Sequence, residues 1–228
     1  MGFVSLYGTP LPHVSFARIF HLQEISSPVF ELVFEVERKF ALTEENEQAL
    51  LVGAEFVGTK IFTDIYYDTP SFALTTKDTW LRARNERFEL KLPLNTGLFK
   101  DRVADQYREI EDEAEIRSAL RLPGDGSMAQ VLRAHGFVSV VQVTTTRRKY
   151  KNGEFMLDFD DMDYGYKVGE IELMVSDASE MGFAAKKIVT FAEQRGLPLV
   201  PVRGKVLEYI RRYSPPHFKA MQDVGLTF

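Results

Sequence analysis

The chain has 228 residues, of which 45% are hydrophobic and 27% charged, enough for one large domain or two small ones with a buried core. Asp and Glu outnumber Lys and Arg by 33 to 28, so the formal net charge is −5 and we expect no nucleic-acid partner. The absence of cysteine excludes a disulfide framework, thiolate zinc ligation and a cysteine nucleophile. No run approaches the roughly 18 apolar residues of a membrane span, so we expect no membrane association.

Residues 1–30 differ in composition from the rest of the chain. They are poor in acidic residues, and Pro10, Pro12 and Pro28 argue against a regular helix or strand there. We predict a weakly ordered leader, with an organellar targeting segment as the alternative. Residues 31–228 contain no repeat or linker and are predicted to form a single domain of a monomeric, cytoplasmic protein.

Alternating polar and apolar residues dominate the chain from residue 30 onward. This pattern predicts strands over 30–40, 60–67, 79–85, 87–92, 106–110, 138–150, 154–162 and 166–174. Helices are predicted over 44–52, 113–120, 128–135, 178–195 and 205–213. Because about eight strands are joined mostly by short turns, we predict an α+β fold whose antiparallel sheet is closed or nearly closed into an eight-stranded β-barrel flanked by helices.

Like charges recur two residues apart on the polar faces of several predicted strands. Glu35 and Glu37 share a face with Lys39, and the pattern returns in Asp158 with Asp160, Glu170 with Glu172, and, with opposite sign, Arg82 with Arg84. These could be the solvated faces of an ordinary sheet. Alternatively, the carboxylates converge on Mg²⁺ or Mn²⁺ while Arg and Lys converge on a polyphosphate.

Other nucleotide chemistries lack their motifs. The sequence has no phosphate loop ending in Gly-Lys-Ser/Thr, no dinucleotide fingerprint and no Gly-x-Ser-x-Gly elbow. The four histidines are scattered and show no ligand spacing, so we interpret them as structural. Tyr66 either ends a strand or points inward near Lys39, and the directions of Arg108 and Arg148 stay open.

The sequence resembles the CYTH superfamily, also called the triphosphate tunnel metalloenzymes. The signature Glu-x-Glu-x-Lys stands at residues 35–39, and further family segments follow in order: Tyr-Tyr-Asp-Thr-Pro at 66–70, Trp-Leu-Arg-x-Arg at 80–84, Glu-Leu-Lys at 89–91, Tyr-Arg-Glu at 107–109, Asp-x-Asp at 158–160, Gly-Glu-x-Glu at 169–172, and Lys205. Within the superfamily it is most similar to the thiamine-triphosphate-hydrolysing branch of animals.

The resemblance implies the site residues. An acidic wall that binds Mg²⁺, with Mn²⁺ possible, would consist of Glu35, Glu37, Glu109, Asp158, Asp160, Glu170 and Glu172. A basic wall that binds the phosphates would consist of Arg82, Arg84, Lys91, Arg147 and Lys205. Lys39 and Tyr66 would act in catalysis, and Trp80 would stack on the thiamine.

The implied activity is a metal-dependent hydrolase that cleaves the terminal phosphate of thiamine triphosphate, a small-molecule substrate. The alternatives are an inorganic tripolyphosphatase or a nucleoside or RNA 5′-triphosphatase in the same tunnel. An adenylate cyclase and a non-catalytic polyphosphate-binding module are further alternatives.

Overall fold

The computed structural model describes residues 34–94 and 102–227. The predicted leader and the predicted strand residues 30–33 lie outside this part of the chain. The eight strands are β1 (Phe34–Ala41), β2 (Glu55–Asp68), β3 (Trp80–Arg84), β4 (Arg87–Pro93), β5 (Asp105–Ile110), β6 (Val138–Asn152), β7 (Phe155–Met162) and β8 (Tyr166–Val175).

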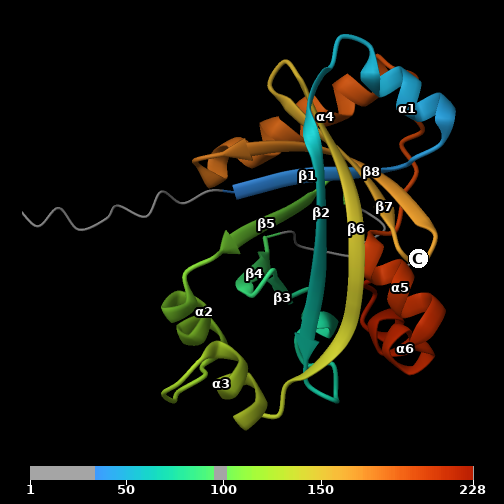
Figure 1. Cartoon of the computed structure of the whole chain (residues 1–228). Coiled ribbons are helices and arrows are strands. Elements are labelled where there is room, and N and C mark those ends of the chain that lie inside the picture. Colours follow the sequence, from blue (N-terminus) through green and yellow to red (C-terminus); the bar gives the residue numbers. More distant parts are fainter. Residues whose placement is uncertain (1–33, 95–101, 228) are drawn as a thin grey trace, which may run out of the picture. The chain divides into compact units, whose positions relative to one another are not determined.

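The strands form one closed antiparallel barrel in the order β1-β5-β4-β3-β2-β6-β7-β8, which confirms the predicted fold class. The long pair of β2 and β6 runs along one side of it (Figure 1). Strand β2 begins at Glu55, five residues before the predicted start. The pairing there is irregular between Phe56 and Gly58, and this bulge obscures the polar and apolar alternation.

Helices cover the outside of the barrel. They are α1 (Glu44–Leu51), α2 (Glu113–Leu120), α3 (Met128–Ala134), α4 (Met181–Glu193), α5 (Lys205–Tyr213) and α6 (Pro215–Asp223), with the 3₁₀ turns η1 (Thr75–Lys77) and η3 (Ala178–Glu180). Helix α6 is not among the helices predicted from the sequence, and it begins with Pro215 and Pro216. Proline is well tolerated in the first turn of a helix, and this is where both lie.

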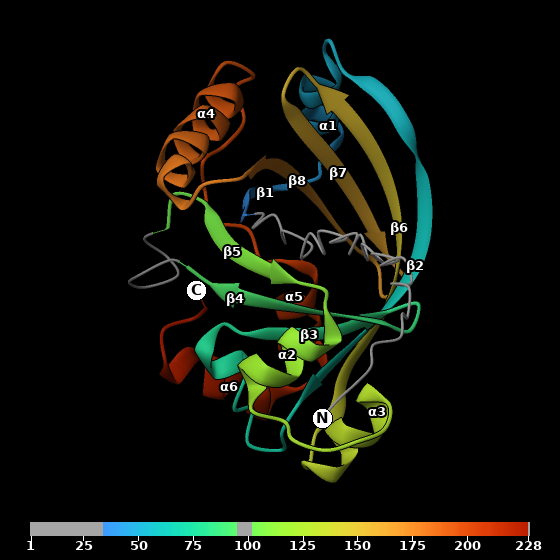
Figure 2. The same cartoon turned by 90° about the vertical axis from the view of Figure 1, so that its left-hand side faces the viewer.

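The apolar core lies outside the barrel, between its outer face and the helices. One cluster packs α4 against β1, β7 and β8 through residues such as Val36, Leu157 and Ile188. A second packs α2 and α3 against β3 to β5, and a third packs α5 and α6 against β6. Figure 2 shows these helices around the strands. Since apolar side chains point outward, the alternate positions place polar side chains inside the barrel.

No helix in the described ranges is both long and apolar enough to cross a membrane.

Candidate functional site

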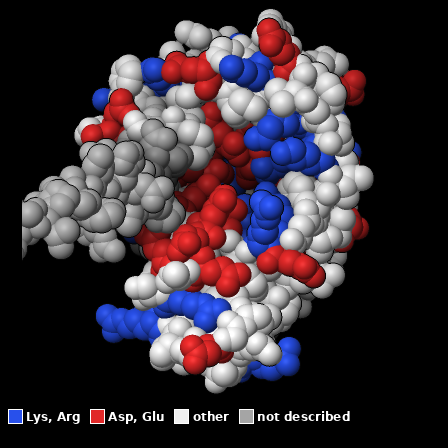
Figure 3. Space-filling view, turned by 60° about the vertical axis from the view of Figure 1, so that its left-hand side comes forward, with Lys and Arg blue, Asp and Glu red and all other residues white. Residues whose placement is uncertain are grey.

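The interior of the barrel holds a cavity of about 120 Å³. Its walls carry predicted site residues from strands far apart in the sequence and from helix α5, namely Glu35, Glu37, Lys39, Tyr66, Trp80, Arg82, Lys91, Arg147, Glu170, Glu172 and Lys205. Figure 3 shows acidic side chains on one side of the hollow and basic side chains on the other. The like charges noted in the sequence therefore face inward rather than toward bulk solvent.

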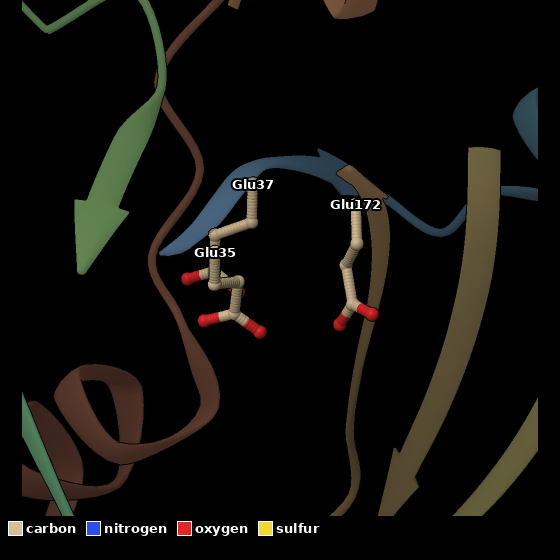
Figure 4. Close-up of side chains that lie close together, drawn as sticks. All are labelled: Glu35, Glu37 and Glu172. Carbon is tan, nitrogen blue, oxygen red and sulfur yellow. The ribbon is translucent and has the colours of Figure 1, made fainter. Parts of the chain in front are cut away.

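The acidic side is assembled by strand register. Glu37 of β1 lies opposite Glu172 of β8, and Asp158 of β7 lies opposite Glu170 of β8. Carboxylate oxygens of Glu35, Glu37 and Glu172 approach within 4.8 Å of one another (Figure 4), and a second such group consists of Asp158, Glu170 and Glu172. All five side chains are buried.

These crowded carboxylates favour a cation between them. Burial raises the pKa of Glu172 well above its usual range, and the neighbouring charges of Asp158 and Glu35 raise it further. Burial likewise raises the pKa of Glu35, against the lowering effect of Lys91. Because every donor is a hard oxygen, the residues fit Mg²⁺ or Mn²⁺.

Arg147 of β6 reaches across to the acidic side. Its Nε lies 2.6 Å from Oδ1 of Asp160 and its Nη2 lies 3.1 Å from Oε2 of Glu170, while Nη1 contacts Asp158. Burial alone would lower the pKa of this guanidinium, but the carboxylates raise it well above its usual range. Arg147 is thus a permanently charged group inside the barrel.

A second basic group surrounds Asp64 of β2, which is fully buried. Arg84 donates to both of its oxygens at 2.7 and 2.9 Å, and the ammonium of Lys205 lies 3.2 Å from its Oδ2. Burial by itself would raise the pKa of Asp64, but these cations depress it below its usual range. Arg82, 3.7 Å from Asp64, also pairs with Glu89 at 2.5 Å.

Lys39 lies between two carboxylates at the cavity wall. Its ammonium donates to Oδ2 of Asp105 at 2.9 Å and also to Glu37. Burial alone would lower the pKa of Lys39, but Asp105 and Glu37 together raise it well above its usual range. The side chain is therefore protonated at neutral pH and can donate but not accept a proton.

Trp80 and Tyr66 form an aromatic pair in the cavity wall. Their ring centroids lie 6.3 Å apart with an interplanar angle of 87°. The indole Nε1 of Trp80 donates to Oδ1 of Asp78 at 2.8 Å. Tyr66 lines the cavity and so points inward, which the sequence left open. Its ring packs against Trp80, whereas Lys39 pairs with carboxylates.

The remaining predicted site residues pair with other charged side chains of the barrel. Arg84 contacts Asp64, Glu109 lies 2.5 Å from the ammonium of Lys91, and Asp158 and Asp160 hold Arg147.

The two arginines whose direction the sequence left open contact helices outside the barrel. Arg108 pairs with Glu115 of α2, and Arg148 donates to Glu47 of α1 at 2.5 and 2.9 Å.

The sequence analysis assigned no site role to four charged residues of this interior: Asp64, Asp78, Asp105 and Lys149. Lys149 lies 3.0 Å from Asp158, and Asp105 lies opposite Glu37 in the strand register. Alternation could have revealed Asp64, which precedes Tyr66 by two positions on the same strand face.

The segment between β2 and β3 is fixed by a buried network. Asp68 accepts from the backbone N–H and the hydroxyl of Thr75 at 2.9 and 2.7 Å. Because that hydroxyl proton is used, Thr75 Oγ1 accepts from Nε2 of His217 at 2.6 Å, and the His217 ring stacks on Phe72. Helix α6 is thereby joined to the segment that leads to Trp80.

The fold and its interior define a tunnel in which a wall of hard oxygen donors faces arginines and lysines, a class of site suited to a polyphosphate with a divalent cation. Comparisons with known proteins support this reading. The model of the CYTH domain family matches residues 34–200. The chain is 32% identical to human thiamine-triphosphatase over 213 residues, which cover 85% of this chain and 91% of that protein. Thiamine-triphosphatase of Macaca fascicularis is 31% identical over the same length and coverage.

A solved structure from Pyrococcus horikoshii OT3 matches with a TM-score of 0.57 and 23% identity, over 78% of this chain and 99% of that one. This likeness supports the fold. The family match and the curated relatives show that the chain belongs to the CYTH family and is a phosphohydrolase.

Proposed function

We propose that this protein hydrolyses the terminal phosphate of thiamine triphosphate, releasing thiamine diphosphate and inorganic phosphate, with Mg²⁺ or, alternatively, Mn²⁺. The observation that carries the proposal is one cavity that joins a carboxylate wall, a set of Arg and Lys side chains, and the aromatic pair of Trp80 and Tyr66. We infer thiamine triphosphate as the substrate from the names of the curated relatives, which are thiamine-triphosphatases.

The metal would be held by the buried carboxylates of Glu35, Glu37, Asp158, Glu170 and Glu172, whose oxygens already lie close together. Glu109 and Asp160, also predicted as ligands, pair with Lys91 and Arg147. When bound, the ion neutralises the charge of the phosphate oxygens and orients the attacking water. The crowding of these carboxylates, which is unfavourable without a cation, supports this assignment.

The phosphates would be bound by Arg82, Lys91, Arg147 and Lys205, with Arg84 holding Asp64 behind them. Each of these cations already pairs with carboxylates inside the barrel. Binding of a metal triphosphate would exchange partners, so that carboxylates turn to the metal and cations turn to the phosphates. No charge would be left uncompensated in the interior, which keeps the cost of desolvation low.

Hydrolysis forms a bond between water oxygen and the terminal phosphorus and breaks the bond from that phosphorus to the bridging oxygen. The electron pair leaves with the diphosphate, and the proton of the water passes to solvent. We assign to Lys39 the stabilisation of negative charge as it develops on the leaving oxygen. The phenol of Tyr66 would position the same end of the substrate through its hydroxyl.

Trp80 would provide the preference for thiamine. An indole attracts a flat cationic ring with about 1 kcal/mol, or somewhat more when the contact is desolvated. An inorganic triphosphate or an uncharged base gains less from this contact, so the aromatic pair would distinguish thiamine triphosphate from tripolyphosphate and ATP.

The test is phosphate release from thiamine triphosphate, tripolyphosphate and ATP in parallel, with Mg²⁺, with Mn²⁺ and with chelator. We expect a preference for thiamine triphosphate that Trp80→Ala reduces, and no turnover in chelator. A preference for tripolyphosphate that Trp80→Ala leaves unchanged would refute the thiamine assignment and keep the tunnel. Full activity in chelator would refute the metal site.

We further propose that residues 31–228 form a single domain, that residues 1–30 are a leader, and that the protein is a cytoplasmic monomer. Light scattering after size-exclusion chromatography tests the monomer, and the N-terminus of the protein isolated from its source tests whether the leader is kept.

A further inference from the structure

Asp78 is a buried carboxylate that the proposed chemistry does not use. It is 3% exposed and lies just after the 3₁₀ turn η1, two residues before Trp80. Its Oδ1 accepts from the Trp80 indole at 2.8 Å and from the Tyr107 hydroxyl at 3.0 Å, and its Oδ2 accepts from Arg102 at 2.6 Å. A group with three donors at short distances is held rigidly.

The contacts of Asp78 continue to Lys39. The same Nη1 of Arg102 that donates to Asp78 lies 3.5 Å from Oδ1 of Asp105, and Oδ2 of Asp105 accepts from the Lys39 ammonium at 2.9 Å. Alternating charges thus connect the indole of Trp80 to the ammonium of Lys39 through Asp78, Arg102 and Asp105.

We propose that Asp78 is a positioning residue that fixes the indole of Trp80 in the tunnel, and that the connection through Arg102 and Asp105 sets its placement relative to Lys39. The site thereby selects triphosphates that carry a flat cationic ring at a fixed distance from the phosphate that is cleaved. The selection part of this inference rests on the proposed function, whereas the positioning of the indole does not.

The backbone at Asp78 allows a clean perturbation. Its φ of 56° lies in the left-handed region, which glycine adopts without cost and asparagine tolerates well. Asp78→Gly therefore removes the carboxylate without backbone strain, and Asp78→Asn keeps an acceptor oxygen for the indole. The matched control is Asn85→Gly, an exposed turn residue with a φ of 48°.

The first measurement is the fluorescence of Trp80, which is the only tryptophan of the chain. We expect Asp78→Gly to increase quenching by acrylamide about twofold or more and to add a fast component to the anisotropy decay, because the indole gains nanosecond motion. Asp78→Asn should show a smaller change and Asn85→Gly none. Fluorescence of Asp78→Gly equal to that of the unaltered protein would overturn the positioning role.

The second measurement is a double-mutant cycle with Trp80→Phe, which removes the indole N–H. Asp78→Gly should lower kcat/KM for thiamine triphosphate about tenfold relative to that for tripolyphosphate. The same change should have little further effect when Phe stands at position 80. Equal losses on both substrates, or additive losses in the cycle, would overturn the selection role.

The two measurements separate this inference from the proposed function. If Trp80→Ala does not alter substrate preference, thiamine selection is refuted, and the fluorescence still decides whether Asp78 holds the indole. Circular dichroism checks that each variant is folded. If Asp78→Gly does not fold, Asp78→Asn and Tyr107→Phe, which removes one donor to Asp78, are measured in its place with the same expected signs.

Discussion

Gly204 offers a way to move Lys39 without changing it. This glycine precedes helix α5 and has a φ of −66°, which any residue adopts, so the backbone does not require glycine there. A Cβ at this position would lie 2.9 Å from Cε and 3.4 Å from Cδ of Lys39. A substitution at this position would therefore act by displacing the Lys39 side chain and not by straining the backbone.

We predict that Gly204→Ala lowers kcat with little loss of stability. To reach an ordinary contact of 3.4 Å, Cε of Lys39 must move by about 0.5 Å, and a misplacement of this order at a reacting group costs about tenfold in rate. Alanine is a poorer N-cap than glycine, but it restricts the unfolded chain, and the two effects of up to about 1 kcal/mol oppose each other.

The assay is steady-state phosphate release together with urea unfolding of the same samples. Gly182→Ala in α4 is the matched control, because a Cβ there meets no atom within 4 Å, and it should leave kcat unchanged. The reasoning is refuted if Gly204→Ala retains full kcat, or if its loss of activity follows a loss of folded protein.

Three further predictions concern the charged interior and the helix that closes the fold. If the charge of Lys39 acts on the leaving oxygen as we propose, Lys39→Ala should lower kcat by about a hundredfold or more while KM changes little; an intact kcat removes Lys39 from the chemistry. Glu172→Gln should raise the Mg²⁺ concentration for half-maximal activity about tenfold, because Glu172 belongs to both carboxylate groups. The same change should leave the resistance to urea unaltered or increase it, because it relieves repulsion among the carboxylates. An unchanged Mg²⁺ titration would contradict the metal site. Burial lowers the pKa of His217 in the folded protein below its usual 6.5, so below pH 6.5 the unfolded chain binds a proton more readily than the folded one. The free energy of unfolding is therefore highest above pH 6.5 and falls as the pH decreases below that value. His217→Gln should flatten the dependence of unfolding free energy on pH below 6.5, and an unchanged slope would exclude His217 as its source.

The physical reason for the His217 prediction lies in its hydrogen bonds. Nε2 carries a proton and donates a hydrogen bond to Thr75 Oγ1, and Nδ1 has no hydrogen-bond partner among the described residues. Protonation of Nδ1 would bury a charge and an unsatisfied donor at a ring that is 1% exposed.

Much of the fold could be predicted from the sequence because a strand with one polar and one apolar face shows its period directly. What period alone could not decide was which face pointed inward. Here the apolar residues of β1, such as Val36, face α4, and Glu35 and Glu37 face the cavity. The repeated like-charge pairs were the one local signal of this arrangement.

The unpredicted part of the site depends on contacts between distant residues. Asp78 and Asp105 are single carboxylates outside any repeated pattern, and their roles come from Trp80, Arg102 and Lys39, which only the folded chain brings to them. The sequence likewise could not show that Lys39 pairs with Asp105, since that contact follows from the antiparallel register of β1 and β5.

The inward charges also explain how a chain with a net charge of −5 can suit a polyanion. The net charge describes the field at long range, which salt screens within about 10 Å, whereas a phosphate in the cavity would meet Arg82, Arg147 and Lys205 directly. Each of these cations is already paired with a carboxylate, so the interior attracts a triphosphate only when a divalent cation can take over the carboxylates. On this reasoning, metal and triphosphate bind cooperatively, and the affinity for triphosphate measured in chelator should be far weaker than that measured with Mg²⁺.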